Sequence, residues 1–289
     1  VPTSGAEMLP ARVPVLGTSP ARAARFMDKL LTQEFFESLS IPAPSILEPG
    51  LYPAMIKPRV GSGGWRNRVV HNDGELASWL GEFGDQPFLS QEVVAGVAAS
   101  VCCVADGIGG ARAIAANRQI LREEEGLHYG FSGSVTPLEH PGVTRMMETA
   151  ERIAAESGCS GTIGIDFVLG DEPWAIEVNP RFQATLDTVE AATGQNLFSL
   201  HARACRGEIP SRRPFQSGYA ARRILFADRD IVVKHDLSSL SPAVADIPWP
   251  GTFFEEGQAV VSVYGWGRSV GDAMDLLDTH MKRVRQYMG

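Results

Sequence analysis

The sequence predicts an α+β fold with antiparallel sheets, from three features. Runs with strand character mostly follow one another directly instead of alternating with helices, which is typical of antiparallel sheets. The 289 residues are 44% hydrophobic and 21% charged, the composition of an ordinary globular protein with ample material for a core. No internal repeat or low-complexity tract interrupts the chain. One large domain, or two or three subdomains, is therefore expected.

The composition excludes several classes of partner. The formal net charge is -8, and no run of basic residues is longer than the pairs at 212–213 and 222–223, so a nucleic-acid partner is not expected. The longest apolar runs fall short of the roughly 20 residues that span a bilayer, so no membrane partner is expected. The four cysteines show no CxxC spacing, which favours reduced, buried thiols and a cytoplasmic location.

The first half of the chain predicts a helix followed by short strands. Ser19 and Pro20 mark the start of a helix whose apolar residues recur at helical spacing as far as Phe35, and "SIPAPS" ends it. Strands are expected at 53–58, 66–71, 88–94, 98–106 and 112–121, with a short helix from Asp73 to about Gly84. Residues 1–18 are rich in proline, glycine and alanine, and we interpret them as a linker or the remnant of an N-terminal domain.

The second half predicts more helices and a closing set of strands. Helices are expected over 143–157, 185–193, 197–205 and about 270–287. The segment from "YAARRILFAD" to "AVVSVYGWG" consists mostly of strands. The small residues of "YGFSGSVTP", at 129–137, indicate a flap, with a plain β-turn as the alternative.

A hairpin at 163–179 carries acidic residues among buried strand residues. If a four-residue turn at 170–173 joins "IGIDFVL" to "WAIEV", Leu169 faces Trp174 and Asp166 falls opposite Glu177, with Cβ atoms about 5 Å apart. Asn179 then lies on the same face, because side chains alternate with period two. Opposed like charges destabilise a sheet unless a cation lies between them.

Two carboxylates and an amide oxygen suit Mg²⁺, with Mn²⁺ as the alternative metal. We therefore predict a metal site of Asp166, Glu177 and Asn179, against the alternative that the acids are solvent-facing residues of an edge hairpin.

A glycine-rich loop follows a short strand in "MIKPRVGSGGWR". Its residues Gly61, Ser62, Gly63 and Gly64 let backbone N–H groups approach an anion, and Lys57 supplies a positive charge for phosphate oxygens. The loop matches neither GxxxxGK[ST] nor GxGxxG, so a Walker site and a Rossmann fold are not supported. A flexible hairpin tip is the alternative.

Together these motifs resemble the ATP-grasp superfamily over about residues 19–206, in its carboxylate-amine ligase, carbamoyl-phosphate synthase and biotin carboxylase-like branch. The most specific element is "GTIGIDFV" followed by "AIEVNPR". The resemblance implies two α+β subdomains, 19–94 and 95–207, whose antiparallel sheets grip ATP. A small β-rich subdomain with a terminal helix is expected at 208–289.

The resemblance also implies roles for individual residues. Lys29 in "FMDKLL" and Lys57 would face phosphate, and Arg181 would hold the acceptor carboxylate or an acyl phosphate. Arg118 is a second catalytic candidate, with a strand-end arginine facing water as the alternative. The stretch "FLSQEVVAG" is similar to the hinge that contacts adenine, which implies roles for Gln91, Glu92, Val93 and Val94. Where the family has an acid for the ribose, this chain has Val97, Ala98 and Ala99.

The activity that the resemblance implies is ATP-dependent ligation with ATP and Mg²⁺. A small-molecule carboxylate would be activated as an acyl phosphate and coupled to an amine, with release of ADP and phosphate. A bicarbonate-activating carboxylase or carbamoyl-phosphate-type enzyme and a non-catalytic nucleotide-binding module are the alternatives, and a homodimer stays open. The family usually carries a further N-terminal domain of about 100 residues, a normal domain size, which is not expected within residues 1–18.

Overall fold

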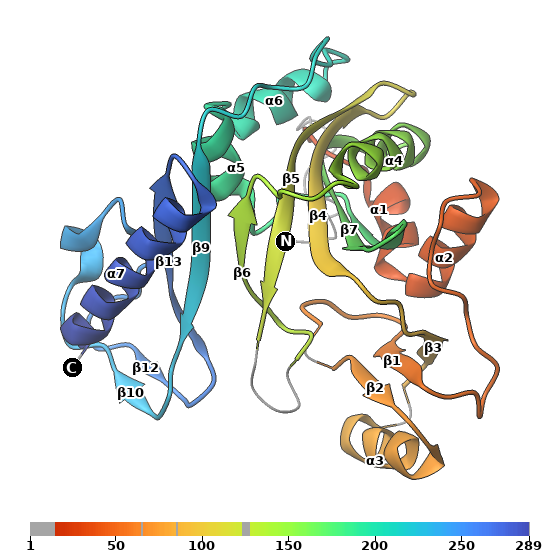
Figure 1. The fold of residues 1–289 in the computed structure, drawn as a ribbon, viewed down its shortest axis with the longest axis horizontal. Coiled ribbons are helices and arrows are strands. Elements are labelled where there is room, and N and C mark those ends of the chain that lie inside the picture. Colours follow the sequence, from red (N-terminus) through yellow and green to blue (C-terminus); the bar gives the residue numbers. More distant parts are fainter. Residues whose placement is uncertain (1–14, 65, 85, 123–127, 289) are drawn as a thin grey trace.

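The computed structural model describes residues 15–64, 66–84, 86–122 and 128–288. Within these ranges the chain forms a small sheet, a large sheet and a two-stranded ribbon, with helices packed on both faces of the large sheet. Every strand pairing is antiparallel. The predicted α+β class with antiparallel sheets is therefore confirmed (Figure 1).

The small sheet has the strand order β2-β1-β3 and lies at the lower right of Figure 1. Its strands are β1 (Ala54–Pro58), β2 (Arg68–Val70) and β3 (Phe88–Glu92). Helix α3 (Asp73–Phe83) begins at Asn72, whose side chain accepts a hydrogen bond from the Glu75 N–H and so caps the helix. Trp79 of α3 is completely buried in this subdomain and donates to the Arg66 carbonyl over 2.7 Å.

The large sheet has the strand order β11-β13-β9-β6-β5-β4-β7-β8. Its strands are β4 (Val97–Asp106), β5 (Ala111–Leu121), β6 (Phe131–Thr136), β7 (Ser160–Leu169), β8 (Pro173–Asn179), β9 (Tyr219–Phe226), β11 (Val244–Ala245) and β13 (Ala259–Gly267). The separate ribbon pairs β10 (Ile231–Val232) with β12 (Phe253–Phe254), and a short 3-10 helix spans Leu237–Leu240.

Both faces of the large sheet are covered, as the alternation along β4 shows. Val101 and Cys103 belong to one hydrophobic core with helix α4 (Val143–Glu156), whereas Cys102 and Val104 belong to another with helices α5 (Leu186–Thr193) and α6 (Leu197–Ala204). Helix α7 (Val270–Met288) packs on β13 and β9. This double coverage makes β4 a mostly buried, apolar strand.

The expected first helix is in fact two helices, α1 (Pro20–Met27) and α2 (Lys29–Ser38). Asp28 between them has an extended backbone and forms a β-bridge with Val60. Its side chain accepts from the Leu30 N–H and forms an ion pair with Arg59 at 2.7 Å. The break therefore arises because Asp28 caps α2 while its backbone pairs with the segment that follows β1.

The acidic hairpin has a shorter turn than expected and a compensating bulge. Leu169 pairs with Pro173 instead of Trp174, so the turn contains three residues, 170–172. A bulge at Ile176 then restores the predicted pairing of Asp166 with Glu177. The two deviations cancel at the acidic pair, which is why simple strand counting reached the correct partner.

The C-terminal segment does not form a sheet of its own beyond the small ribbon. Strand β9 pairs with β6, and β13 pairs with β9, so residues 219–267 extend the large sheet.

Strand β6 lies within the segment 129–137 that was expected to be a flap or turn, and it pairs with strands on both sides. That expectation was wrong for Phe131–Thr136, because β-branched and small residues there complete the sheet. None of the helices in the described ranges has both the length and the apolar character needed to cross a bilayer.

Candidate active site

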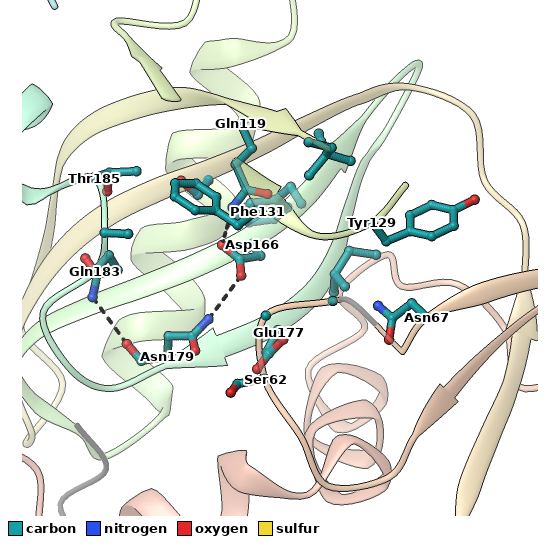
Figure 2. A pocket seen from close by; sticks show the side chains of 18 of the residues that line it. Ser62, Asn67, Gln119, Tyr129, Phe131, Asp166, Glu177, Asn179, Gln183 and Thr185 are labelled. Carbon is teal, nitrogen blue, oxygen red and sulfur yellow. Dashed lines mark hydrogen bonds between the residues drawn. The ribbon is translucent and has the colours of Figure 1, made fainter. Parts of the chain in front are cut away.

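A cavity of about 400 Å³ lies between the glycine-rich loop and the β7–β8 hairpin. Figure 2 shows Ser62 and Asn67 on the loop side, facing Asp166, Glu177 and Asn179 of the hairpin, with Tyr129 and Phe131 nearby. The volume lies in the range of small-molecule sites, roughly 300–1,000 Å³. The cavity thus joins two motifs that the sequence predicted separately.

The acidic hairpin places three predicted metal ligands on this cavity. Asp166 on β7 is directly paired with Glu177 on β8, and Asn179 lies two residues beyond Glu177, opposite Gly164. The Asn179 amide donates to Asp166 Oδ2 over 3.1 Å, and the Gln119 amide donates to Asp166 Oδ1 over 2.9 Å. Asp166, Glu177, Asn179 and Gln119 all line the cavity.

The electrostatics of this group favour a cation. The pKa of Asp166 is raised to about 7, mainly by burial and also by the neighbouring Glu177 carboxylate, against the lowering effects of Arg181, Gln119 and Asn179. No group of three or more His, Cys, Asp and Glu side chains in the described part of the chain could hold a metal, so a metal here would rely on two carboxylates and an amide. Oxygen donors of this kind, with room left for phosphate oxygens, fit Mg²⁺.

Arg181 and Gln183 follow the hairpin and line the same cavity. Arg181 donates to Asn179 Oδ1 and to the Phe182 carbonyl, each over 3.1 Å. The Gln183 amide donates to the backbone carbonyls of Arg181 and Asn179. A Cβ atom at Gly164 would lie 2.3 Å from the Gln183 side chain, so the glycine on β7 makes room for it. The segment after β8 is thereby folded back over the strand.

The glycine-rich loop closes the cavity on the opposite side. Gly63 and Gly64 have φ values of 80° and 72°, in the left-handed region that favours glycine. The Gly63 carbonyl accepts from the Phe131 N–H over 3.3 Å, and a Cβ atom on Gly64 would lie 2.0 Å from the Tyr129 carbonyl oxygen. The loop therefore packs closely on the backbone that leads into β6.

The two predicted phosphate lysines lie near the loop in different settings. Lys29 Nζ donates to the Gly61 carbonyl over 2.7 Å, and together with Glu177 it lines a small cavity of about 40 Å³ beside the loop. Lys57 is buried in β1 and does not line the 400 Å³ cavity. The pKa of Lys57 is lowered to about 8, mainly by burial and also by the charge of Lys29, while attraction to Glu177 opposes this change. Both lysines thus lie close enough to Glu177 for their positive charges to act in its surroundings.

The predicted hinge residues do not line the 400 Å³ cavity. Gln91 is buried, and its amide donates to Gln33 Oε1 over 3.0 Å and to the Pro44 carbonyl over 3.4 Å. Glu92 is exposed at the end of β3, and Val93 and Val94 lead toward β4. Their contact with adenine stays a prediction.

Arg118 does not line the 400 Å³ cavity, and its catalytic role stays a prediction. It is exposed on β5 and pairs with Ala99 and Val135, while its neighbour Gln119 lines the cavity and bonds to Asp166. Consecutive strand residues point to opposite faces, so a displacement of one position decides which residue reaches the site. Gln119 was missed because an amide in a strand carries little signal before the neighbouring strand is known.

Other residues of the cavity were also missed by sequence reasoning. They are Asn67 beside the glycine loop, Ser100 and Thr185 on the sheet side, and the rings of Tyr129 and Phe131. Ser100 accepts from the buried Asn117 amide over 3.2 Å, and Asn117 in turn accepts from Thr136. This polar network is completely internal, so only the alternation of polar residues along β4, β5 and β6 could have indicated it.

With this geometry in place, the ATP-grasp domain family matches residues 26–185, and the chain belongs to that family. The match runs from α1 to the residue that precedes α5, and so contains the glycine loop and the acidic hairpin. The predicted membership is confirmed.

Known relatives extend this likeness beyond the family domain. The carbamoyl phosphate synthase large chain of Rubrobacter xylanophilus is 29% identical over 281 residues, which cover 85% of this chain and 26% of that one. The corresponding large chain of Pyrobaculum aerophilum is 30% identical over 159 residues, covering 52% of this chain and 15% of that one. This chain therefore spans only about a quarter, or less, of these relatives.

Solved structures share the fold at low sequence identity. The biotin carboxylase domain of Hydrogenobacter thermophilus 2-oxoglutarate carboxylase, a dimer in complex with MgADP and bicarbonate, has a TM-score of 0.75 and 14% identity, and the alignment covers 99% of this chain and 70% of that one. Phosphoribosylamine–glycine ligase from Thermotoga maritima has a TM-score of 0.74 and 17% identity, with 96% and 80% covered. These similarities show the ATP-grasp fold.

Proposed function

We propose that this chain uses ATP to activate a small-molecule carboxylate as an acyl phosphate and couples it to an amine, with release of ADP and phosphate. The observation that carries the proposal is the pairing of Asp166 with Glu177 on the cavity that the glycine loop closes, with Asn179 and Arg181 beside them. Family membership and the names of the relatives, which include a synthase, a carboxylase and a ligase, agree with this class of reaction.

The reaction requires two displacements. A carboxylate oxygen attacks the γ-phosphorus of ATP, the bond from that phosphorus to the bridging oxygen breaks, and ADP leaves with the electron pair. The amine nitrogen then attacks the acyl carbon, the carbon–oxygen bond to phosphate breaks, and the nitrogen loses a proton. Phosphoryl transfer depends mainly on positioning and charge stabilisation, which are what this cavity supplies.

Different residues of the chain would bind the phosphates, orient the carboxylate and hold the metal. Backbone N–H groups of residues 61–64 and the charges of Lys29 and Lys57 would offset phosphate charge. Arg181 would orient the carboxylate, since a guanidinium suits bidentate contacts with carboxylates and phosphates. Asp166, Glu177 and Asn179 would hold Mg²⁺, or Mn²⁺ in its place. When bound, such a metal neutralises negative charge on the phosphate oxygens.

Bicarbonate is a second candidate for the activated carboxylate. The observation in its favour is the 29% identity to a carbamoyl phosphate synthase large chain over 85% of this chain. The residues that would carry out the phosphoryl transfer are the same in both reactions.

The test uses hydroxylamine as a surrogate amine, because it captures any acyl phosphate as a hydroxamate. With MgATP and a panel of carboxylates, we expect hydroxamate and ADP in equal amounts. Bicarbonate would be scored by ADP release alone. AMP and pyrophosphate in a turning-over reaction would contradict the proposal.

A metal-coupling test probes the acidic pair without turnover. Glu177→Gln removes one charge while keeping the shape, so it should melt no lower than wild type in EDTA. It should lose most of the extra thermal shift that wild type gains from Mg²⁺ plus ATP over the sum of each alone. Ligand binding at a hundredfold excess over Kd stabilises by about 2.7 kcal/mol, which is a measurable shift. Glu156→Gln, at an exposed position at the end of α4, is the matched control. A full coupled shift in Glu177→Gln would show that the hairpin acids are structural.

A further inference from the structure

A second cavity, of about 330 Å³, adjoins the first beside helix α1. It is bounded by α1, by residues 60–62 at the start of the glycine loop and by residues 177–181 at the end of β8. Ser62, Glu177, Asn179 and Arg181 line both cavities. A molecule in the second cavity would therefore end at the same side chains as a nucleotide in the first.

One part of the lining of the second cavity is apolar. Phe26 and Met27 of α1, Val60 and Pro180 form it, and Glu177 and Arg181 are the charged side chains among the described residues that line it. Met27 is 46% exposed and Val60 is 55% exposed, so neither is used in core packing. Large apolar side chains at the rim of a cavity are typical of a ligand site.

The cationic residues of α1 do not face this cavity. Arg22 donates to the Gly107 carbonyl over 3.1 Å, and the guanidinium of Arg25 lies 4.7 Å from the centre of the Phe35 ring. Among the described residues, the apolar part of the lining therefore offers no partner to an anionic group at the other end of a ligand. Charge recognition is confined to the end that carries Arg181 and Glu177.

Arg181 can take a carboxylate at that end. A guanidinium has five N–H donors, and the hydrogen bonds to Asn179 Oδ1 and the Phe182 carbonyl leave donors for a ligand. Arg181 is the cationic side chain among the described residues that line this cavity, so the lining offers a partner for one carboxylate, next to apolar side chains. The combination selects one carboxylate attached to an apolar body.

We propose that the second cavity binds an apolar monocarboxylic acid as the carboxylate to be activated, with its carboxylate on Arg181 and its body against Phe26, Met27 and Val60. This inference rests on the proposed function and specifies its substrate class. Bicarbonate would leave the apolar wall uncovered, so the cavity favours an organic acid.

The experiment measures carboxylate binding by calorimetry, with and without Mg²⁺ and a non-hydrolysable ATP analogue. Hexanoate should bind at least about tenfold more tightly than succinate or bicarbonate, which is about 1.4 kcal/mol. Met27→Glu and Val60→Asp should each lose at least about tenfold in hexanoate affinity while they retain the affinity for the nucleotide analogue. Leu31→Glu and Leu51→Asp place the same charges at exposed apolar positions outside both cavities and should bind hexanoate like wild type.

The outcomes separate this inference from the proposed function. Equal binding of hexanoate and succinate, or hexanoate binding to Met27→Glu as tight as to wild type, would overturn the inference. Binding of the nucleotide analogue with response to bicarbonate alone would also overturn it, yet leave ATP-dependent activation intact. Hexanoate binding with no binding of the nucleotide analogue would support the cavity assignment and count against the proposed function.

Discussion

Asp166 lies where burial and the Glu177 carboxylate both favour its protonated form. Asn179 and Gln119 each donate one hydrogen bond to it, which offsets only part of this effect. A group whose folded-state pKa is raised contributes stability at low pH, and that stability is lost as the pH rises through the folded value. In Asp166 this loss accumulates between its ordinary pKa of 3.8 and about 7.

We therefore expect Asp166→Asn to flatten the pH dependence of stability in EDTA. The variant resembles the protonated acid, so it should melt close to wild type near pH 4 and above wild type at pH 8. Thermal unfolding followed by circular dichroism checks this, with Asp171→Asn in the exposed turn as the control. A wild-type melting temperature at pH 8 equal to or above that of Asp166→Asn would refute the assignment.

Lys57 presents the opposite case, a buried base. Its pKa is lowered from 10.5 to about 8, so its contribution to stability is present above pH 10.5 and is lost as the pH falls through 8. At pH 7 the charged form is therefore costly to the folded protein without ligand. A bound phosphate would offset this cost, because its negative charge would attract the charged Lys57 side chain.

Lys57→Met keeps most of the buried volume and removes the charge. We expect the variant to be at least as stable as wild type at pH 7 and to bind MgATP more weakly by about tenfold, or about 1.4 kcal/mol. Truncation to alanine would confuse this result, because it also leaves a cavity in β1. Calorimetric titration and melting curves check both effects, with Lys234→Met at an exposed position as the control. Unchanged MgATP affinity would mean that Lys57 does not act on phosphate.

At the scale of elements, the glycine loop depends on its contact with the backbone before β6. Gly64 and Gly84 have similar φ values of 72° and 75°, but a Cβ atom at Gly84 meets nothing within 4 Å, whereas one at Gly64 meets the Tyr129 carbonyl oxygen at 2.0 Å. Alanine at Gly84 therefore tests backbone strain alone, whereas alanine at Gly64 adds a steric clash that would displace the loop.

We expect Gly84→Ala to cost about 1–3 kcal/mol of stability from its backbone conformation alone, because φ 75° with ψ -177° is a region that essentially only glycine adopts. MgATP affinity should stay unchanged. Gly64→Ala should cost at least about 1 kcal/mol more and should weaken MgATP binding as well. Denaturant unfolding and nucleotide titration measure the two effects. If both variants lost the same stability and bound MgATP like wild type, the loop would not be held by the Tyr129 backbone.

At the scale of the whole molecule, the C-terminal segment is joined to the site. Arg222 on β9 donates to the Ala184 carbonyl at the cavity, and also to Ser262 over 2.6 Å and to Asp246 over 3.1 Å. Tyr264 on β13 donates to Asp187 of α5 over 2.6 Å. Val135 of β6 belongs to the same hydrophobic core as β9, β13 and α7. The C-terminal segment thus completes the sheet that supports the active-site residues.

A fragment of residues 1–217 should therefore fail to fold as a stable monomer. It would leave the edge of β6 unpaired and the core around Val135 open, and exposed strand edges promote aggregation. Size-exclusion chromatography and melting curves check this. Residues 218–289 supplied as a separate chain should restore a cooperative transition. A fragment that alone melts cooperatively at the wild-type temperature would show an independent N-terminal unit.

The sequence by itself determined the fold class, the family and the positions of the acidic residues in the hairpin. Period-two alternation places Glu177 and Asn179 on one face, and counting from the expected turn brings Asp166 opposite Glu177 because the shorter turn and the bulge cancel. The pattern Glu-x-Asn-x-Arg is contiguous, so it is visible without any distant contact. The glycine loop was equally local, because the glycines themselves mark where a backbone can approach an anion.

Only the tertiary structure decided what depends on distant segments. Asp28 breaks the first helix because it meets Arg59 and Val60, and Phe131–Thr136 form a strand because β5 and β9 lie on either side. Gln119 lines the cavity, whereas Arg118 does not, because Gln119 lies on the sheet face that also carries Asp166, on the far side of β4. The apolar cavity beside α1 exists because residues 26–27, 60–62 and 177–181, far apart in sequence, meet there. Local propensity does not predict such long-range contacts, since they depend on how the elements pack against one another.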